Sequence, residues 1–290
     1  MKTYKIMERK YIWIGISLIV ISLGFVFMAF RGLNWGIDFT GGNILHFDLN
    51  QSYDLARARA ILEKLDIKEF EAKKAGDDQQ ELIIRTVELS KDLQAKVQET
   101  LKQEWPETEL VRAETIDAVI GKELQRQAII ALILANIGML IYITFRFELY
   151  SAIAAVVALV HDVLVVISFY AIFNVPVDST FIAVILTIVG YSINDTIVIF
   201  DRIRENLRVM NKASFDEVAN LSISQSLLRT INTSMTTLLT VAALYFLGGE
   251  TIKDFTLALL VGISTGTYSS IFIASPLWSI FRGKAQAAKA

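Results

Sequence analysis

The sequence predicts an α-helical membrane protein with six transmembrane helices and one small α+β domain outside the membrane. Three observations favour this fold class. Hydrophobic residues make up 53% of the 290 residues, and the mean hydropathy is +0.47. Charged residues make up only 20%, against about 25% in soluble domains. The charges gather in residues 31–127, which hold fourteen of the 28 Lys and Arg residues and nineteen of the 30 Asp and Glu residues.

Crossing about 30 Å of hydrocarbon takes about 20 helical residues, and six apolar segments meet this requirement. The first is too long for the roughly 7–15-residue apolar region of a cleavable signal peptide, and no small-x-small site follows it, so we expect it to be retained. Small residues such as Gly262 and Gly266 in the last segment are interpreted as ordinary helix-packing residues. The six segments are Tyr11–Phe30, Ala128–Phe145, Leu149–Phe173, Ser179–Phe200, Ile231–Leu247 and Phe255–Phe281.

The positive charges of the short loops predict the orientation. With the N-terminus inside, the inner segments carry thirteen Lys and Arg residues, and the two short outer loops carry only Lys253. Both termini are therefore expected in the cytoplasm. The chain then divides into an N-terminus and first span at residues 1–30, an extracytoplasmic domain at residues 31–127, and a five-helix region at residues 128–290 with a cytoplasmic loop at residues 201–230.

The outer domain has the order β-α-β-β-α-β, which is typical of a ferredoxin-like sandwich with one sheet and two helices on one face. Its helices are indicated by apolar residues at helical spacing, and Ser90 has the character of an N-cap for the second helix. About 95 residues suffice for such a core without disulfides. The predicted elements are strands Asn43–Leu49, Phe70–Lys74, Glu81–Glu88 and Glu109–Glu114, a helix over Asp54–Leu65 and a helix from Ser90 to near Pro106.

The loop after the fourth span is also organised. Asp201–Arg208 contains no helix breaker and is expected to continue the fourth helix. Ser214 to Glu217 has the S-x-x-E form of a capping box, which predicts the start of another helix that leads into the fifth span.

Several classes of function are disfavoured by composition. The chain has no cysteine, so disulfides and thiolate metal sites are excluded, and its two histidines argue against any metal site. A net charge of −2 leaves no basic face for nucleic acid. The sequence has no P-loop, no GxGxxG and no nucleophile elbow, so we expect no cofactor, no enzymatic activity and no direct use of ATP.

Three ionisable residues lie within predicted spans. Because placing an ionisable side chain in the membrane costs free energy, these residues are candidate functional residues. Asp195 lies near the inner end of the fourth span beside Asn194, and it either handles protons or serves as a structural hydrogen-bonding residue. His161 and Asp162 lie near the middle of the third span and are candidate accessory polar sites. Because adjacent helical positions point about 100° apart, we do not expect these two residues to form one site.

Two further features have a plain structural interpretation. Arg229 begins the fifth span, where composition alone favours a positive anchor at the membrane surface. The stretch from Trp35 to Gly42, WGIDFTGG, follows the first span. Its glycines permit positive φ, and we interpret it as a rigid turn into the first strand in which Trp35, Gly36, Asp38, Gly41 and Gly42 have structural roles.

These motifs carry a resemblance to a known family. WGIDFTGG at residues 35–42, GYSINDT at residues 190–196, the DRIREN stretch at residues 201–206 and the RTINTS stretch at residues 229–234 resemble the SecF family. The resemblance covers nearly the whole chain, including the number of spans and the single outer domain.

The resemblance implies a role beside SecD in a complex of RND type, in which each subunit gives six spans to a pseudo-symmetric whole within the bacterial inner membrane. It implies association with SecYEG, often with YajC, and use of the proton-motive force to assist late export of preproteins. The aspartate and the arginine of the family's proton pathway correspond to Asp195 and Arg229. For Arg229 this implication reverses the interpretation from composition.

Two other functions stay open. One is a self-sufficient RND-like exporter, although six spans and one outer domain amount to half of a twofold transporter. The other is a passive assembly subunit of the translocase that moves no protons.

Overall fold

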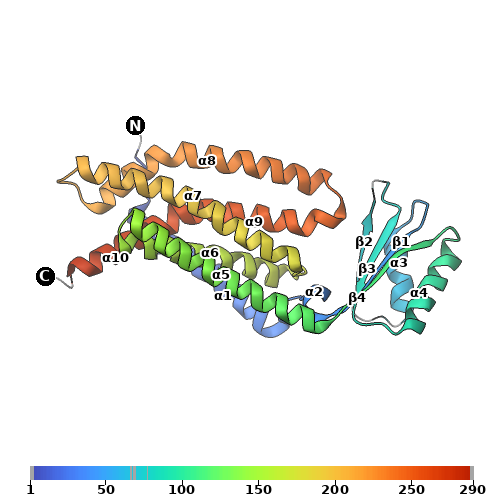
Figure 1. The fold of residues 1–290 in the computed structure, drawn as a ribbon. Helices are drawn as coiled ribbons and strands as arrows, with labels where there is room; N and C mark the ends of the chain where they lie inside the picture. Colours follow the sequence, from blue (N-terminus) through green and yellow to red (C-terminus); the bar gives the residue numbers. More distant parts are fainter. Residues whose placement is uncertain (1–2, 66, 68–69, 77, 288–290) are drawn as a thin grey trace.

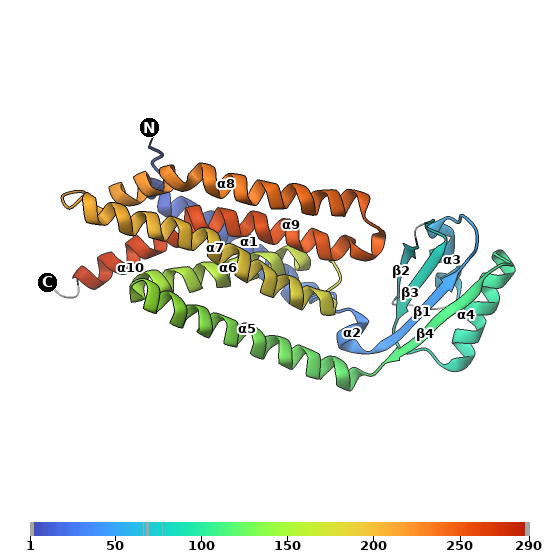
Figure 2. The ribbon, with the colours of Figure 1, turned by 45° about the horizontal axis from the view of Figure 1, so that its top comes forward.

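The structure, a computed structural model, describes residues 3–65, 67, 70–76 and 78–287. Long helices form a bundle, and a small α+β domain lies at one end of it (Figures 1 and 2). The chain crosses the bundle once in α1 (Lys10–Arg31) and builds the domain between α2 (Ile37–Thr40) and β4 (Glu109–Ile116). It returns to the bundle in α5 (Ala118–Arg146). Helix α10 (Ser275–Ala287) and the start of α1 lie at the end farthest from the domain (Figure 1).

Within the described residues, six helical stretches are long and apolar enough to cross a membrane, which confirms the predicted spans. The chain is a multi-pass membrane protein. The bundle consists of α1 (Lys10–Arg31), α5 (Ala118–Arg146), α6 (Leu149–Phe173), α7 (Ser179–Val209), α8 (Phe215–Leu247), α9 (Lys253–Ser269) and α10 (Ser275–Ala287), with short 3₁₀ turns at Met7–Arg9 and Glu250–Ile252.

The helices extend beyond the predicted spans. Helix α7 continues to Val209, and the Ser214 side chain and Glu217 form the predicted capping box at the start of α8. Helix α5 begins at Ala118, before the predicted span, because Asp117 caps it by accepting a hydrogen bond from the Val119 N–H. The last predicted span contains a π-helical turn at Ser270–Ala274, through which α9 continues into α10.

The α+β domain has the predicted ferredoxin-like topology. Its antiparallel sheet has the strand order β2-β3-β1-β4, and every neighbouring pair is antiparallel. Helices α3 and α4 cover one side of the sheet (Figures 1 and 2). No bound of the six predicted elements differs from the prediction by more than two residues, and the short helix α2 lies in the stretch predicted to be a turn. The elements are α2 (Ile37–Thr40), β1 (Gly42–Asp48), α3 (Leu55–Lys64), β2 (Phe70–Ala75), β3 (Glu81–Thr86), α4 (Lys91–Glu104) and β4 (Glu109–Ile116).

The core of this domain lies between the sheet and its two helices. Alternate residues of the strands, such as Phe47 and Ile84, point towards the helices, and Leu62 and Leu101 fill the space from the helical side. All four are at most 1% exposed. This period-two alternation on the strands, met by a helical stripe, is the pattern from which the sandwich is predicted.

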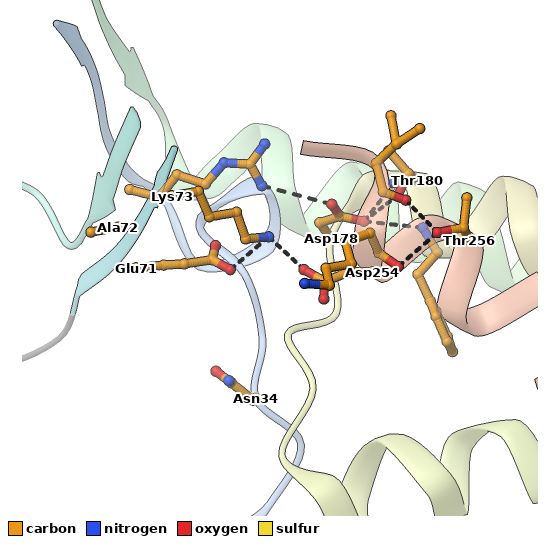
Figure 3. Close-up of polar contacts among 12 residues, drawn as sticks. Asn34, Glu71, Ala72, Lys73, Asp178, Thr180, Asp254 and Thr256 are labelled. Carbon is orange, nitrogen blue, oxygen red and sulfur yellow. Dashed lines mark hydrogen bonds and ion pairs between the residues drawn. The ribbon is translucent and has the colours of Figure 1, made fainter. Parts of the chain in front are cut away.

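Ion pairs join the sheet to the bundle. Lys73 on β2 lies between Glu71, at 2.8 Å, and Asp254 in the first turn of α9, at 2.5 Å (Figure 3). Arg85 on β3 lies 3.7 Å from Asp178, the N-cap of α7. The domain is therefore attached to the ends of the two helices that carry most of the candidate site.

Candidate functional site

Helix α7 holds the first candidate residue, Asp195, which is 2% exposed. The Ser234 hydroxyl on α8 donates to its Oδ2 at 3.1 Å, and the Thr267 hydroxyl on α9 donates to Ser234 Oγ at 2.7 Å. No Lys, Arg or His among the described residues lies within ion-pair distance of this carboxyl group. A buried carboxyl group whose hydrogen-bonding partner is a hydroxyl can exist with or without its proton, and the two states differ by a full charge inside the bundle.

Arg229 lies on α8 and is exposed on the bundle surface. It forms no ion pair with Asp195 in the part of the chain that the structure describes, although its charge interacts with that of Asp195 at longer range. The structure thus brings the two predicted residues into electrostatic range without direct contact.

Asn194 does not join the Asp195 network, because it lies on the outward face of α7. Thr187, Gly190 and Asn194 follow one another at helical spacing on this exposed face. The Tyr191 hydroxyl ties the face to α8 by donating to the Thr233 carbonyl at 2.9 Å. The neighbouring face of α8 adds exposed polar residues at Arg229, Asn232, Thr233, Thr236 and Thr240. The threonine hydroxyls on these faces donate to carbonyls of their own helices. The amide and guanidinium groups of Asn194, Asn232 and Arg229 are not satisfied by lipid tails, so their position on the outside of the spans indicates contact with another protein.

A second buried carboxyl group lies on α6. Asp162 is 0% exposed, and its Oδ2 accepts hydrogen bonds from Ser192 on α7 at 2.6 Å and from Ser269 on α9 at 2.8 Å. Its Oδ1 lies 2.9 Å from Nδ1 of His161. Asp162 therefore links three helices of the bundle.

The contact between His161 and Asp162 corrects the expectation that these neighbours do not form one site. The Cβ atoms of adjacent helical residues do point about 100° apart. Rotation about the side-chain bonds of His161 nevertheless brings Nδ1 within hydrogen-bond distance of the neighbouring carboxylate. Helix geometry fixes the direction of the Cα–Cβ bond. The position of a ring nitrogen at the end of the side chain also depends on the side-chain rotamer.

Close packing of α7 against α9 makes both networks possible. A Cβ atom at Gly266 would lie 2.8 Å from the Ser192 Cβ, and one at Gly262 would lie 2.0 Å from the end of the Ile188 side chain. The π-helical turn follows directly, and it begins at Ser270, whose hydroxyl lies 2.8 Å from that of Thr196. π-helical turns are rare in proteins, and those that do occur are often found at functional sites.

The predicted motif from Trp35 to Gly42 turns the chain into β1. Trp35 pairs with Val177 in an isolated bridge, and Gly36 N–H donates to the Val177 carbonyl at 2.8 Å. Gly41 has φ +80°, and a Cβ atom at Gly42 would lie 2.1 Å from the Thr86 carbonyl oxygen. Only glycine fits these last two positions.

Asp38 in this motif has a role that the sequence did not reveal. Its Oδ2 accepts hydrogen bonds from the backbone N–H of Ser179 at 2.9 Å and from the Ser179 hydroxyl at 2.6 Å. Together with Asp178, it therefore caps the N-terminus of α7, the helix of Asp195.

Sequence reasoning did not identify Ser192, Ser234, Thr267 and Ser269 as hydroxyl partners of the buried carboxyl groups. The only sequence signal for these residues is the high number of hydroxyl side chains within otherwise apolar spans. Nothing in the local pattern distinguishes a serine that packs between helices from one that donates a hydrogen bond to a carboxylate. Within the described residues no group of three or more His, Cys, Asp and Glu side chains is arranged to hold a metal ion.

Comparison with known families and relatives agrees with this architecture. Residues 96–284 match the family model described as protein export membrane protein SecD/SecF, C-terminal, and residues 26–45 match the SecD/SecF GG motif. Protein translocase subunit SecF of Sebaldella termitidis is 42% identical over 96% of this chain and 92% of the relative. The subunit of the same name from Acidaminococcus fermentans is 39% identical over 98% of this chain and 99% of the relative.

A solved structure has the same fold. The crystal structure of SecDF, a translocon-associated membrane protein from Thermus thermophilus, matches with a TM-score of 0.84 at 34% identity. The match covers 97% of this chain but only 39% of that chain, so this chain spans well under half of the SecDF polypeptide. Because the first family model covers more than half of the chain and the relatives match along nearly all of it, the chain belongs to the SecF family of protein translocase subunits.

Proposed function

We propose that this auxiliary subunit of the Sec translocase works with a SecD-like subunit and uses the proton-motive force to promote late export of preproteins across the bacterial inner membrane. The observation that carries the proposal is the burial of Asp195 in α7 with the Ser234 hydroxyl as its hydrogen-bonding partner. In this function the chain makes and breaks no covalent bond of a substrate and needs no cofactor.

Protonation of Asp195 removes a charge from the interior of the bundle. A charged carboxylate accepts a stronger hydrogen bond than a neutral carboxyl group, so the contact with Ser234 differs between the two states. The relative positions of α7, α8 and α9 then depend on whether a proton is bound, because this contact joins α7 to the two other helices.

The helices that respond to Asp195 also hold the α+β domain. The start of α7 is capped by Asp178 and Asp38, and Asp178 faces Arg85 of β3. The first turn of α9 pairs with Lys73 of β2 (Figure 3). A shift of either helix is therefore transmitted to the sheet, which supplies a route from proton binding to movement of the domain that meets the preprotein.

The exposed polar face of α7 and α8 is the surface that we assign to the SecD-like partner. Asn194 and Arg229 lie on it, and partner helices would remove both from lipid. SecYEG, and often YajC, complete the assembly around these two subunits.

The charge distribution supports an orientation with both termini in the cytoplasm and residues 31–127 outside. In this orientation the short inner segments carry thirteen Lys and Arg residues, and the short outer loops carry one. The chain has no cysteine, so single cysteines give a clean measurement. Glu88→Cys should react with an impermeant thiol reagent added to spheroplasts, and Lys212→Cys should not. The reverse pattern contradicts the orientation.

The decisive experiment replaces Asp195 by Asn, which keeps the size and hydrogen-bonding capacity but cannot exchange a proton near neutral pH. Inverted membrane vesicles are supplied with ATP and assayed for preprotein translocation with and without an uncoupler. The variant should accumulate and copurify with its partner, yet translocate at the rate that the wild type shows with uncoupler. Asp201→Asn, on the same helix but paired with Arg146 at the bundle surface, is the matched control.

The outcomes separate the alternatives. If Asp195→Asn vesicles respond fully to the proton gradient, Asp195 does not carry the proton and the passive assembly subunit is favoured. If the purified chain transports a substrate as a homo-oligomer without a SecD-like partner, the exporter is favoured.

Arg229→Lys tests the second residue. Lysine keeps the charge but lacks the planar fork that suits a carboxylate, so export stimulation should fall if Arg229 acts on Asp195. Full activity at normal membrane levels would assign Arg229 to surface anchoring alone.

A further inference from the structure

The pair formed by His161 and Asp162 lies on α6, apart from the contacts of Asp195. Asp162 is fully buried, and Oδ2 is occupied by the hydroxyls of Ser192 and Ser269. Among the described residues, His161 is the only potential cation within ion-pair distance of this carboxylate. A buried carboxylate requires a partner of opposite charge or a proton of its own, so the charge of this site depends on the state of His161.

One atom of the network is unsatisfied. With Nδ1 directed at the carboxylate, the other ring nitrogen of His161, Nε2, is buried and has no hydrogen-bond partner in the described part of the chain. The side chain is 9% exposed and borders a cavity of about 260 Å³ between α1, α6 and α9. The lining of this cavity is mostly apolar, and the hydroxyls of Ser17 and Tyr268 are among its few polar groups. The unpartnered ring nitrogen therefore belongs to a side chain that borders a small cavity within the bundle.

We propose that His161 and Asp162 form a second proton-binding site of the membrane region, which exchanges its proton at Nε2 beside this cavity and acts on the Asp195 site through α7 and α9. This inference rests on the proposed function of Asp195. Binding of a proton forms the Nε2–H bond and makes the ring a cation beside the carboxylate, so that the pair is neutral. Release breaks the same bond and leaves a neutral ring, with Nδ1–H donating to the carboxylate, and a net charge of −1.

The geometry connects the charge of the pair to the other site. Ser192 lies one turn before Asp195 on α7, and Ser269 lies two residues after Thr267 on α9. The hydroxyl hydrogen bonds to Asp162 are strongest when the carboxylate charge is not balanced by a cationic ring. A change of protonation at the His161–Asp162 pair therefore changes how firmly α6 holds α7 and α9, two of the three helices that meet at the Asp195 network.

The other ionisable groups around the pair are few. The Tyr268 ring on α9 stacks against the His161 ring at a centroid distance of 6.3 Å. On α7 the nearest acidic residue along the helix is Asp195, which faces Ser234 rather than α6. The charged residues on the other packed helices lie at the helix ends, where Lys10 of α1 pairs with Asp216, Arg146 of α5 pairs with Asp201, and Arg282 of α10 pairs with Glu148.

The first test measures the protonation of His161 directly. The chain contains only His46 and His161, so His46→Gln leaves a single histidine. The full chain, labelled with ¹⁵N in the imidazole ring, is studied in lipid bilayers by solid-state NMR. The His161 signals should change from the charged to the neutral form as the pH of the sample is raised. In Asp162→Asn this change should occur at a different pH, because the anionic partner is gone. A ring that keeps one state at every pH tested overturns the proposal.

The second test measures coupling to export in the inverted-vesicle assay. His161→Asn keeps an amide N–H near the position of Nδ1 but removes the exchangeable nitrogen. It should accumulate normally, lose most of the proton-dependent stimulation, and lose the dependence of that stimulation on pH. Ser168→Ala, elsewhere on α6 with its hydroxyl donating to the Leu164 carbonyl of its own helix, should behave as the wild type. If His161→Asn fails to accumulate, His161→Gln replaces it.

The outcomes separate this inference from the proposed function. If the wild type is insensitive to uncoupler, or if Asp195→Asn keeps full stimulation, the proposed function fails, and the NMR titration still decides whether the pair binds a proton. If both of those results are as expected but His161→Asn keeps the wild-type stimulation and pH profile, the second site is refuted while the role of Asp195 stands.

Discussion

The α+β domain and the helix bundle bury different kinds of side chain. The domain is filled by large apolar residues, and its few fully buried polar side chains include Asn43 and Thr86 on the strands. The bundle buries alanine and glycine at its helix contacts together with many hydroxyl side chains, among them Ser151, Ser168, Ser192, Thr196, Ser222, Ser234, Ser269 and Ser270.

This difference reflects the two solvents. In water the domain gains stability by removing apolar area from the solvent, at about 25 cal/mol per Å². Inside lipid there is no such gain, so helices associate through close contact of small residues and through hydrogen bonds. The same condition concentrates hydroxyls around Asp195 and Asp162, because a buried polar group must find its partner within the protein. The domain should therefore be sensitive to loss of volume, and the bundle to gain of volume.

The largest effect is expected from Phe47→Ala, which removes a 1% exposed ring from the domain core. The loss should be about 3–5 kcal/mol of domain stability. Thiol labelling of an Ala58→Cys reporter, which is buried in the folded domain, measures this loss during a urea titration, since the chain has no other cysteine. Val111→Ala removes a 58% exposed side chain and is the control. Equal effects of the two changes would contradict this account of the core.

Gly266→Ala should break the bundle by adding a single methyl group. The new Cβ would lie 2.8 Å from the Ser192 Cβ, so α7 and α9 must separate, at a cost of about 1–3 kcal/mol. Labelling of a buried Ala154→Cys reporter after brief heating of membranes measures the loss. Gly138→Ala, where a Cβ meets no heavy atom within 4 Å, should be neutral or stabilising. Unchanged heat resistance in Gly266→Ala would show that α7 and α9 are not held by close contact.

Lys73→Gln tests the junction between the two regions. Burial lowers the pKa of Lys73, but its hydrogen bonds to Asp254 and Glu71 outweigh burial and raise the pKa above its ordinary value of 10.5. The stabilisation is therefore complete below pH 10.5 and is lost as the pH rises through the higher folded value. We expect it to be about 1 kcal/mol.

Spin labels at Lys91→Cys and Gly249→Cys measure this attachment as the distribution of distances between the domain and the bundle. The distribution should broaden in Lys73→Gln at pH 7, and in the wild type only at strongly alkaline pH. Lys74→Gln is the control, because Lys74 contacts Tyr53 within the domain. Broadening in the control, or none in Lys73→Gln, would remove Lys73 from the junction.

The smallest effect is expected from Glu104→Gln in the exposed pair with Arg57. The hydrogen bond from Arg57 holds the pKa of Glu104 below its ordinary value of 4.5. The pair therefore contributes stability above pH 4.5, which is lost as the pH falls through the lower folded value. Because water screens an exposed pair, the Ala58→Cys reporter should show little change at pH 7. A shift that approaches that of Phe47→Ala would contradict the solvent argument.

Much of the fold could be predicted because its signals are local. The spans are contiguous apolar segments, the strands of the domain alternate, and the Ser214 capping box lies within four residues. Asp195 is recognisable as a candidate functional residue because placing a carboxyl group within a membrane span costs free energy. These features need only a stretch of chain and knowledge of the solvent around it.

The tertiary structure alone decided which polar groups meet. Asp162 and Ser269 are 107 residues apart, and Asp38 and Ser179 are 141 residues apart, so no local pattern pairs them. The need for Gly266 likewise appears only when Ser192 lies against it. The sequence by itself determined the solvent of each segment and the residues whose burial is costly. The partners of those residues were set by the packing of α6, α7 and α9, because hydrogen bonds depend on ångström distances between chain segments that only the assembled bundle brings together.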